Sequence, residues 1–303
     1  MRMLITGAWN DAQTHFAELR QMGHEIIWMQ DERGELPSGS TDAEGVICNG
    51  LFLHHSLDQF PLLRFIQLTS AGFDRVPLDE IKHRDITIHN AKGVYSIPMA
   101  EFAIGGVLQL YKQSRFFMQN QQAHRWEKHR GLLELYGKTV CILGTGSVGS
   151  ECAMRFRAFG CRVLGVNIRP RRVAHFDDVY GFDCLDSVLA LSDIVILALP
   201  LTEQTRHFIN EAHLGEMKLG SILVNLSRGA VVDTDALLQA LETNLGGAIL
   251  DVFEEEPLSA SNPLWSLENV LITPHNSFVG DGIRERLYRT IMDNLRLYHQ
   301  NSE

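Results

Sequence analysis

Short apolar runs alternate along the chain with longer amphipathic stretches, a pattern typical of parallel strands joined by helices. The early apolar runs predict strands at Met3–Thr6, Ile26–Met29, Gly45–Cys48, Phe65–Thr69 and Ile86–His89. A later series predicts strands at Thr139–Leu143, Arg162–Asn167, Ile194–Leu199, Ile222–Leu226, Ala248–Val252 and Val270–Thr273. The two series together indicate an α/β protein.

Apolar residues at helical spacing predict helices between and after these strands. One helix is expected to start near Pro98, because proline is well tolerated in the first helical turn, where its missing N–H has no partner. Another is expected to close the chain from about Gly282, with apolar residues at every fourth position. The segment Gln119–Arg130 is polar, and we interpret it as a surface excursion or an interface arm.

Composition narrows the class of protein. The length of 303 residues favours about two domains, and the 45% hydrophobic content excludes disorder as the main state. A formal net charge of −10 argues against a general binder of nucleic acid or of anionic membranes. The longest apolar run, Ile194–Leu201, is too short to span a membrane.

Cysteine usage bears on the compartment. The five cysteines show no CxxC spacing, which argues against a zinc site or a disulfide framework and for a reducing environment. The N-terminus reaches Gly7 before a signal-like apolar segment can form. We therefore expect a cytoplasmic protein with neither a membrane nor a nucleic-acid partner.

The most specific local motif is a glycine loop that follows the strand at Thr139–Leu143 and opens a helix ended by Gly160. A further strand comes next, which completes the βαβ unit that a dinucleotide-binding fingerprint requires. The loop glycines would permit a tight turn, close approach of the backbone to a pyrophosphate, and close packing of helix on strand. The alternative is a turn that merely needs glycine. The residues expected at the cofactor are Gly144, Thr145, Gly146, Ser147, Val148 and Gly149.

The end of the next strand bears on which dinucleotide binds. A carboxylate there would accept hydrogen bonds from the ribose 2′-hydroxyl of NAD, but this chain has Asn167. Arg169, Arg171 and Arg172 follow and could bind the 2′-phosphate of NADP. The sequence therefore favours NADP, with NAD possible, and a solvated basic loop is the alternative role for the arginines.

Three polar residues follow later strands of the same series. Arg228 lies in a Ser-Arg-Gly motif, Glu256 precedes Pro257 in Asp-Val-Phe-Glu-Glu-Glu-Pro, and His275 ends Thr-Pro-His. Residues just beyond the carboxyl ends of parallel strands face a ligand crevice at a topological switch point. An arginine, a carboxylate and a histidine in that place suit hydride transfer to a ketone beside a carboxylate. Taken singly, each residue has an ordinary alternative role. Arg228 could form a surface ion pair, Glu256 could belong to a solvated acidic loop, and His275 could be a structural histidine.

With these motifs the chain resembles the D-isomer-specific 2-hydroxyacid dehydrogenases, a family that includes glyoxylate/hydroxypyruvate reductases. The match covers nearly the whole chain, and its motifs occur in the family's order. The matching segments are Ser70–Asp74, Asn90 with Gly93, Met99–Glu101, the glycine loop, Leu199–Thr202 with Thr205, and the three motifs of Arg228, Glu256 and His275.

The resemblance implies a role for each residue at the site. Arg228 would hold the substrate carboxylate together with the backbone N–H groups of Ala71 and Gly72. His275 would give a proton to the ketone oxygen of a small 2-oxoacid, and Glu256 would orient the imidazole and favour its protonated form. The resemblance also implies contacts to the cofactor from Pro200, Thr205 and Asp251.

The resemblance further implies a Rossmann-type, doubly wound coenzyme domain inserted into a smaller flavodoxin-like substrate domain. We expect the substrate domain at residues 1–92 and 276–303, and the dinucleotide-binding domain at 93–275. Relatives are usually homodimers, and the active site is expected in the cleft between the domains. Three features depart from the family pattern: the bulky run Asn276–Gly280 after the histidine, the apolar Leu51–Leu53 where relatives often contact the substrate, and Asn167 at the cofactor position.

Two other functions stay open. A dinucleotide-sensing binding module, such as a corepressor, would keep this fold and bind a protein partner with little turnover. Formate oxidation on the same scaffold is disfavoured, because formate enzymes of the superfamily have glutamine in place of Glu256.

Overall fold

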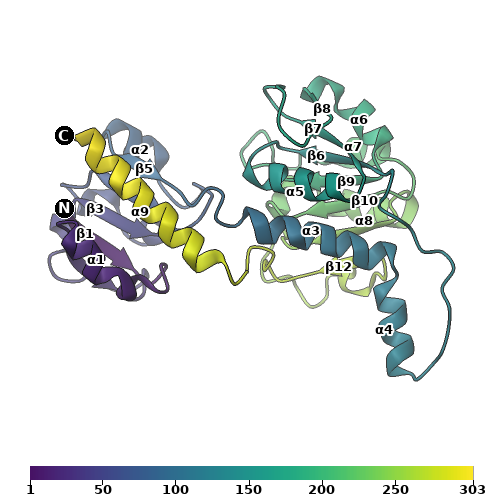
Figure 1. The fold of residues 1–303 in the computed structure, drawn as a ribbon, viewed down its shortest axis with the longest axis horizontal. Helices are drawn as coiled ribbons and strands as arrows, with labels where there is room; N and C mark the ends of the chain where they lie inside the picture. The colour runs from purple at the N-terminus through teal and green to yellow at the C-terminus, as the bar shows by residue number, and fades with distance from the viewer. Residues whose placement is uncertain (303) are drawn as a thin grey trace. The chain divides into compact units, whose positions relative to one another are not determined.

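The computed structural model describes residues 1–302, with the side chains of residues 1–300, and the chain divides into two compact units (Figure 1). The first unit contains Met1–Tyr95 and the chain from Gly280 onward, and the second contains Ser96–Val279. From the sequence we expected these divisions after residues 92 and 275. The second unit is thus an insertion within the first.

The first unit is built on a parallel sheet with the strand order β2-β1-β3-β4-β5. This order is that of the flavodoxin-like folds. The strands are β1 (Arg2–Thr6), β2 (Glu25–Met29), β3 (Gly45–Cys48), β4 (Phe65–Leu68) and β5 (Thr87–His89). The helices are α1 (Phe16–Gln21), α2 (Leu78–His83) and α9 (Ile283–Ser302), with short 3-10 turns η1 (Ala12–His15), η2 (Ser40–Asp42), η3 (Leu51–Leu53) and η4 (Leu57–Gln59).

Both faces of this sheet are buried, because successive strand residues point to opposite sides and each side meets apolar partners. Met3 and Ile5 of β1 belong to the core cluster of one face, to which α9 contributes Ile291 and Leu295. Leu4 of β1 points to the other face, into a separate core cluster. The apolar periodicity of α9 therefore docks the end of the chain onto the sheet formed by its beginning.

The second unit contains a larger parallel sheet with the strand order β12-β11-β10-β9-β6-β7-β8. The order reverses beside β6, where Leu143 is in register with Val166 of β7 on one side and Leu197 of β9 on the other. This is the doubly wound order of Rossmann-type domains. The strands are β6 (Thr139–Leu143), β7 (Arg162–Val166), β8 (Asp178–Tyr180), β9 (Ile194–Leu197), β10 (Ile222–Asn225), β11 (Gly247–Leu250) and β12 (Val270–Ile272).

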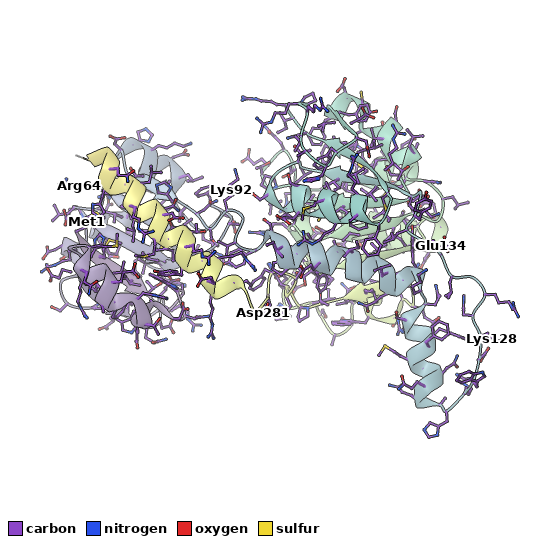
Figure 2. All side chains as sticks on the ribbon, in the orientation of Figure 1. Met1, Arg64, Lys92, Lys128, Glu134 and Asp281 are labelled. Carbon is purple, nitrogen blue, oxygen red and sulfur yellow. The ribbon has the colours of Figure 1, made fainter. Side chains whose placement is uncertain are left out.

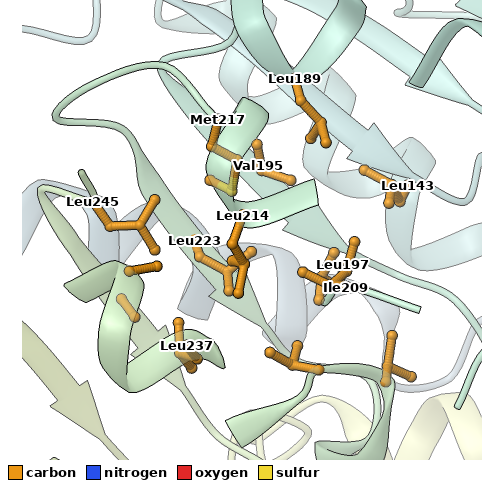
Figure 3. Packing of buried hydrophobic residues seen from close by; sticks show 14 of the residues in the cluster. Leu143, Leu189, Val195, Leu197, Ile209, Leu214, Met217, Leu223, Leu237 and Leu245 are labelled. Carbon is orange, nitrogen blue, oxygen red and sulfur yellow. The ribbon is translucent and has the colours of Figure 1, made fainter. Parts of the chain in front are cut away.

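Helices cover both faces of this sheet (Figure 1). One core cluster joins α3 and α5 to the sheet through residues such as Val107 and Phe156. The other, shown in Figure 3, joins it to α6, α7 and α8 through Leu189, Leu214 and Leu237. The helices are α3 (Ser96–Tyr111), α4 (Ser114–Gln122), α5 (Ser147–Ala158), α6 (Leu185–Leu191), α7 (Glu211–Glu216) and α8 (Thr234–Thr243), with 3-10 turns η5 (Phe182–Cys184), η6 (Gly229–Val231) and η7 (Pro263–Ser266).

The predicted α/β class and the predicted strands are confirmed, with ends that differ by one or two residues. The strand β8 was not predicted, because its apolar run consists of Val179 and Tyr180 alone and Asp178 is exposed. The segment interpreted as an arm starts inside α4, and Figure 2 shows that the chain then loops out past Lys128 and returns to the body of the unit at Glu134. Among residues 1–302, no helix is both long and apolar enough to cross a membrane.

Candidate active site

The glycine loop lies at the carboxyl end of β6, where the strand order of the second unit reverses. Gly144 has a φ of +100°, and a Cβ there would lie 2.4 Å from the carbonyl oxygen of Ala198. A Cβ on Gly149 would lie 2.0 Å from the carbonyl oxygen of Gly144. Only glycine allows this turn and this close approach of α5 to the loop.

The start of α5 fits a phosphate group. A Cβ built on Gly146 would meet nothing within 4 Å, so the backbone there is open to a ligand. Within residues 1–302, the amide N–H groups of Gly146, Ser147 and Val148 donate to no protein acceptor. Free N–H groups and the positive end of a helix dipole attract a pyrophosphate, so these residues suit a dinucleotide.

Asn167 follows β7 and faces the glycine loop. Its Nδ2 donates to Thr145 Oγ1 at 2.7 Å, and its Oδ1 accepts from the N–H of Ile168 at 2.9 Å. The three arginines that follow are exposed, and none forms an ion pair within the described chain: Arg169, Arg171 and Arg172. The loop therefore carries positive charge that no protein carboxylate neutralises.

His275 and Glu256 are in direct contact. His275 Nδ1 lies 2.8 Å from Glu256 Oε2, and about a third of each side chain is exposed, 38% and 37% respectively. Glu256 Oε1 accepts from the N–H of Phe253 at 3.0 Å, which fixes the carboxylate. Because Nδ1 is bound to the carboxylate, Nε2 of the ring is the nitrogen left to meet a substrate.

The turn that carries His275 is held by Asp251 at the end of β11. His275 has a left-handed backbone, with a φ of +51°, and its N–H donates to the carbonyl oxygen of Asp251 at 2.8 Å. The Asp251 carboxylate is fully buried and accepts from Thr273 Oγ1, Asn276 N and Ser277 N at 2.6, 2.7 and 2.9 Å. These bonds stabilise a backbone conformation that is otherwise unfavourable for histidine.

Arg228 stands in a turn shaped by the buried Asn225. Asn225 Oδ1 accepts from both the N–H and the hydroxyl of Ser227, at 3.1 and 2.9 Å, and its Nδ2 donates to the carbonyl oxygen of Arg228. Arg228 Nη1 donates to the carbonyl oxygen of Ser227 at 2.8 Å. The hydrogen bonds of Asn225 thus fix the backbone of the turn after β10 that carries the Arg228 guanidinium.

Pro200 and Thr205 belong to the loop after β9. Thr205 Oγ1 donates to the carbonyl oxygen of Pro200 at 2.7 Å and accepts from the N–H of Thr202 at 2.7 Å. Both predicted residues therefore lie in one hydrogen-bonded turn beyond the carboxyl end of a strand that neighbours β6.

Ala71 and Gly72 lie in the first unit, in the loop after β4. Asn90 Nδ2 donates to the carbonyl oxygen of Ala71, and the Tyr95 hydroxyl donates to that of Thr69. In the described part of the chain, the N–H groups of Ala71 and Gly72 have no acceptor. The loop is thus held by its carbonyl groups while its amides stay available to an anion.

Two side chains that shape the site had no role assigned from the sequence. Asn225 holds the turn of Arg228, and Glu254 bonds to His207 at 2.6 Å. Asn90, which belongs to one of the matching segments, holds the loop of Ala71, and nothing local in the acidic run predicts the contact of Glu254 with His207. Among the described residues, no group of three or more histidine, cysteine or acidic side chains could hold a metal ion.

Comparison with known proteins identifies the family. Residues 104–277 match the model of the D-isomer specific 2-hydroxyacid dehydrogenase NAD binding domain. The chain is 33% identical over 281 residues to a glyoxylate reductase from Thermofilum pendens, covering 90% of this chain and 83% of that protein.

Solved structures agree with this match. A D-lactate dehydrogenase from Aquifex aeolicus, complexed with NAD and lactic acid, is 27% identical with a TM-score of 0.81, covering 99% of this chain and 96% of that one. A D-isomer specific 2-hydroxyacid dehydrogenase from Xanthobacter autotrophicus, in complex with NADPH, is 26% identical with a TM-score of 0.81, covering 99% and 95%. The chain therefore belongs to the D-isomer-specific 2-hydroxyacid dehydrogenases, oxidoreductases that transfer hydride between a nicotinamide cofactor and a 2-hydroxyacid or 2-oxoacid.

Proposed function

We propose that this protein reduces a small 2-oxoacid to the D-2-hydroxyacid with NADPH as the preferred cofactor. The observation that carries the proposal is the contact between His275 Nδ1 and Glu256 Oε2 at 2.8 Å. This contact orients the imidazole so that Nε2 can give a proton to a ketone oxygen and take it back in the reverse direction. The bound nicotinamide supplies the hydride.

The substrate carboxylate would be held by Arg228 and by the amides of Ala71 and Gly72. A guanidinium offers two parallel donors to a carboxylate, and backbone N–H groups add neutral donors. Those two amides have no protein acceptor in the described chain, which supports this assignment.

Asp251, Pro200 and Thr205 remain proposed contacts of the cofactor. A carboxylate offers about four acceptor positions, and the buried Asp251 uses three of them on side-chain and backbone donors of the turn that carries His275. One position is left for the carboxamide of the nicotinamide. Pro200 and Thr205 would border the same ring from the loop after β9.

The preference for NADP rests on the loop after β7. Asn167 has no charge to repel a 2′-phosphate, and its amide is held by Thr145 at 2.7 Å. Arg169 and Arg171 are exposed and carry no ion pair within residues 1–302. Solved relatives include complexes with NADPH and with NAD, so family membership alone does not fix the cofactor and the proposal depends on this loop.

We further propose that the protein is a homodimer joined through its second unit. Helix α4 and the arm that follows from it expose apolar side chains, with Met118 of α4 at 59% and Trp126 of the arm at 98% exposure. A groove of about 640 Å³ lies beside it, lined by Leu110, Met118 and Val270 among others. A second copy of the same surface would cover these apolar groups.

A cytoplasmic location is proposed from the cysteines. All five are unpaired, and Cys48, Cys141, Cys152 and Cys161 are buried. Unpaired cysteines are typical of a reducing compartment.

The test is an assay of the purified protein with glyoxylate, hydroxypyruvate and phenylpyruvate, each with NADPH and with NADH. The expected result is oxidation of the cofactor, faster at low concentration with NADPH. Binding of NADPH without turnover of any of these acids would instead favour a dinucleotide-sensing module. Turnover that prefers NADH would reject the cofactor assignment and leave the reaction class intact.

A further inference from the structure

Glu254 joins three loops of the second unit that lie far apart in the sequence. Its Oε2 lies 2.6 Å from Nε2 of His207, which follows β9, and its Oε1 accepts from Thr234 Oγ1 at 2.6 Å. The same oxygen accepts from the N–H of Thr234 at 3.2 Å. We call the side chains of His207, Thr234 and Glu254 the loop clamp.

The Glu254 carboxylate lies at the N-terminus of α8, where a negative charge is favourable. Thr234 is the first residue of α8, where backbone N–H groups have no partner within the helix and the dipole favours negative charge. Burial raises the pKa of Glu254, but hydrogen bonds from Thr234 and His207 outweigh it, and the pKa lies below its ordinary value. The group is therefore ionised at neutral pH.

Each loop of the clamp also carries a residue of the proposed site. Thr205 is two residues before His207, and Glu256 is two residues after Glu254. Arg228 precedes Gly229, and a Cβ on Gly229 would lie 1.8 Å from the carbonyl carbon of Phe253. The turn of Arg228 and the loop of Glu254 are thus in direct backbone contact.

Backbone hydrogen bonds also join the loop of His207 to the turn that follows Arg228. The N–H of His207 donates to the carbonyl oxygen of Ala230 at 2.7 Å, and that of Ile209 donates to Val231 at 3.0 Å. His207 has a φ of +48°, so the chain turns sharply at the residue whose ring meets Glu254. A change in the clamp would therefore reach all three loops at once.

We propose that His207 and Glu254 are positioning residues, which act through Thr205, Arg228 and Glu256 to hold the site in its reactive geometry. This inference rests on the proposed function, because it assigns those three residues to the reaction. Displacement of reacting groups by about 1 Å lowers rates by up to about a hundredfold. A residue that fixes their loops therefore affects turnover without touching the substrate.

The chain offers a matched control. Glu255 is adjacent to Glu254 and exposed, and within the described residues it makes no side-chain hydrogen bond or ion pair. Glu254→Gln and Glu255→Gln remove the same charge from the same loop. The first variant removes an acceptor of the clamp, and the second leaves the clamp intact.

The experiment measures five quantities for both variants and the unchanged protein: kcat and KM for glyoxylate, the Kd for NADPH, the Tm of thermal unfolding, and amide hydrogen exchange of residues 205–209, 229–234 and 252–256. For Glu254→Gln we expect kcat to fall about tenfold or more, and KM and the NADPH Kd to rise by a smaller factor, because Arg228 and Thr205 shift while the glycine loop keeps its own contacts. Exchange should rise in all three segments. Glu255→Gln should match the unchanged protein in every quantity.

Variants of His207 test rescue. His207→Leu removes the donor and should reproduce the effect of Glu254→Gln, whereas His207→Gln keeps a donor and should restore most of the activity. The kcat of the double variant Glu254→Gln with His207→Leu should be no lower than that of the less active single variant. The reason is that both substitutions remove the same contact between His207 and Glu254.

Two results would overturn the inference: equal kcat and exchange in Glu254→Gln and Glu255→Gln, or a loss of turnover matched by an equal loss of NADPH binding and of thermal stability. Failure of the proposed function is distinguishable. In that case the unchanged protein would reduce no 2-oxoacid, while hydrogen exchange would still report on the clamp.

Discussion

The chemistry proposed for this protein depends on how single residues are held. His275 has a left-handed backbone that Asp251 stabilises through its carbonyl oxygen and, at the next two residues, through its carboxylate. Glu256 then fixes the direction of the ring through Nδ1. Orientation comes from the backbone and from the carboxylate together, and both are needed to aim one nitrogen at a substrate.

His275→Gln tests the proton-transfer role. We expect kcat for 2-oxoacid reduction to fall by about two to four orders of magnitude, because glutamine cannot supply the proton. The Kd for NADPH should stay unchanged, since the glycine loop is a separate segment, and this binding serves as the control for folding. Near-normal turnover would reject the assignment of His275.

Arg169→Ala tests recognition of the 2′-phosphate. The KM for NADPH should rise, by about tenfold for the loss of one charge-assisted contact, while the KM for NADH stays the same. Steady-state assays with both cofactors give the comparison within one variant. A matched control is Arg33→Ala, which removes an exposed arginine of the first unit that is paired with Asp31. Equal effects on both cofactors would rule out the 2′-phosphate contact.

At the scale of elements, α9 ties the end of the chain to its beginning. Its apolar residues pack on the sheet of the first unit, Asn294 Nδ2 donates to the buried Gln67, and His299 Nε2 lies 3.2 Å from His24 Nε2. Burial, the amino terminus and His299 lower the pKa of His24 from 6.5 to about 4. A proton on His24 therefore opposes the docking of α9.

This contact predicts a pH dependence of stability. The unfolded chain protonates His24 near pH 6.5 and the folded chain only near pH 4, so the contribution is present above pH 6.5 and is lost as the pH falls toward 4. Thermal unfolding at about pH 7.5 and about pH 5.5 should show a smaller fall in Tm for His24→Gln than for the unchanged protein. The exposed His83 gives the control variant His83→Gln. A fall in Tm equal in all three proteins would contradict the assignment.

At the scale of the whole molecule, the chain starts in one unit, forms a second and returns to the first. The second unit holds the glycine loop, the Glu256–His275 pair and the surface of α4 and the arm that exposes Met118 and Trp126. It therefore combines the cofactor chemistry with the surface proposed for assembly.

The proposed homodimer predicts a solution mass near twice 34.1 kDa. Met118→Asp should raise the dimer dissociation constant by about tenfold or more, because a charge would be buried against an apolar surface. Leu191→Asp is a matched control, since Leu191 is 57% exposed and Met118 is 59% exposed. Light scattering after gel filtration gives the masses. A monomeric unchanged protein, or equal masses in the two variants, would reject this interface.

Much of the fold could be predicted from the sequence because its signals are local. Apolar runs such as Thr139–Leu143 and Gly45–Cys48 mark the buried strands, and glycines mark the turn at β6. The edge strands β5 and β12 are as short as β8 but lie within apolar runs, whereas β8 has only Val179 and Tyr180 between Asp178 and Gly181, which is too short a run to predict a strand. The motifs of Arg228, Glu256 and His275 identified candidate residues but not the side chains that hold them.

The sequence by itself determined the class of fold, the cofactor loop and the residues proposed to carry the chemistry, because strand burial and motif spacing are written in neighbouring positions. The contact of Glu256 with His275 was expected from the resemblance, and the structure contains it. Only the tertiary structure decided the other acidic contacts: Glu254 joins His207 to Thr234, and Asp251 holds the His275 turn. The physical reason is that these contacts join residues far apart in the chain, which meet only when the chain packs. The acidic residues carry the same charge, so charge alone does not tell which partner each one contacts.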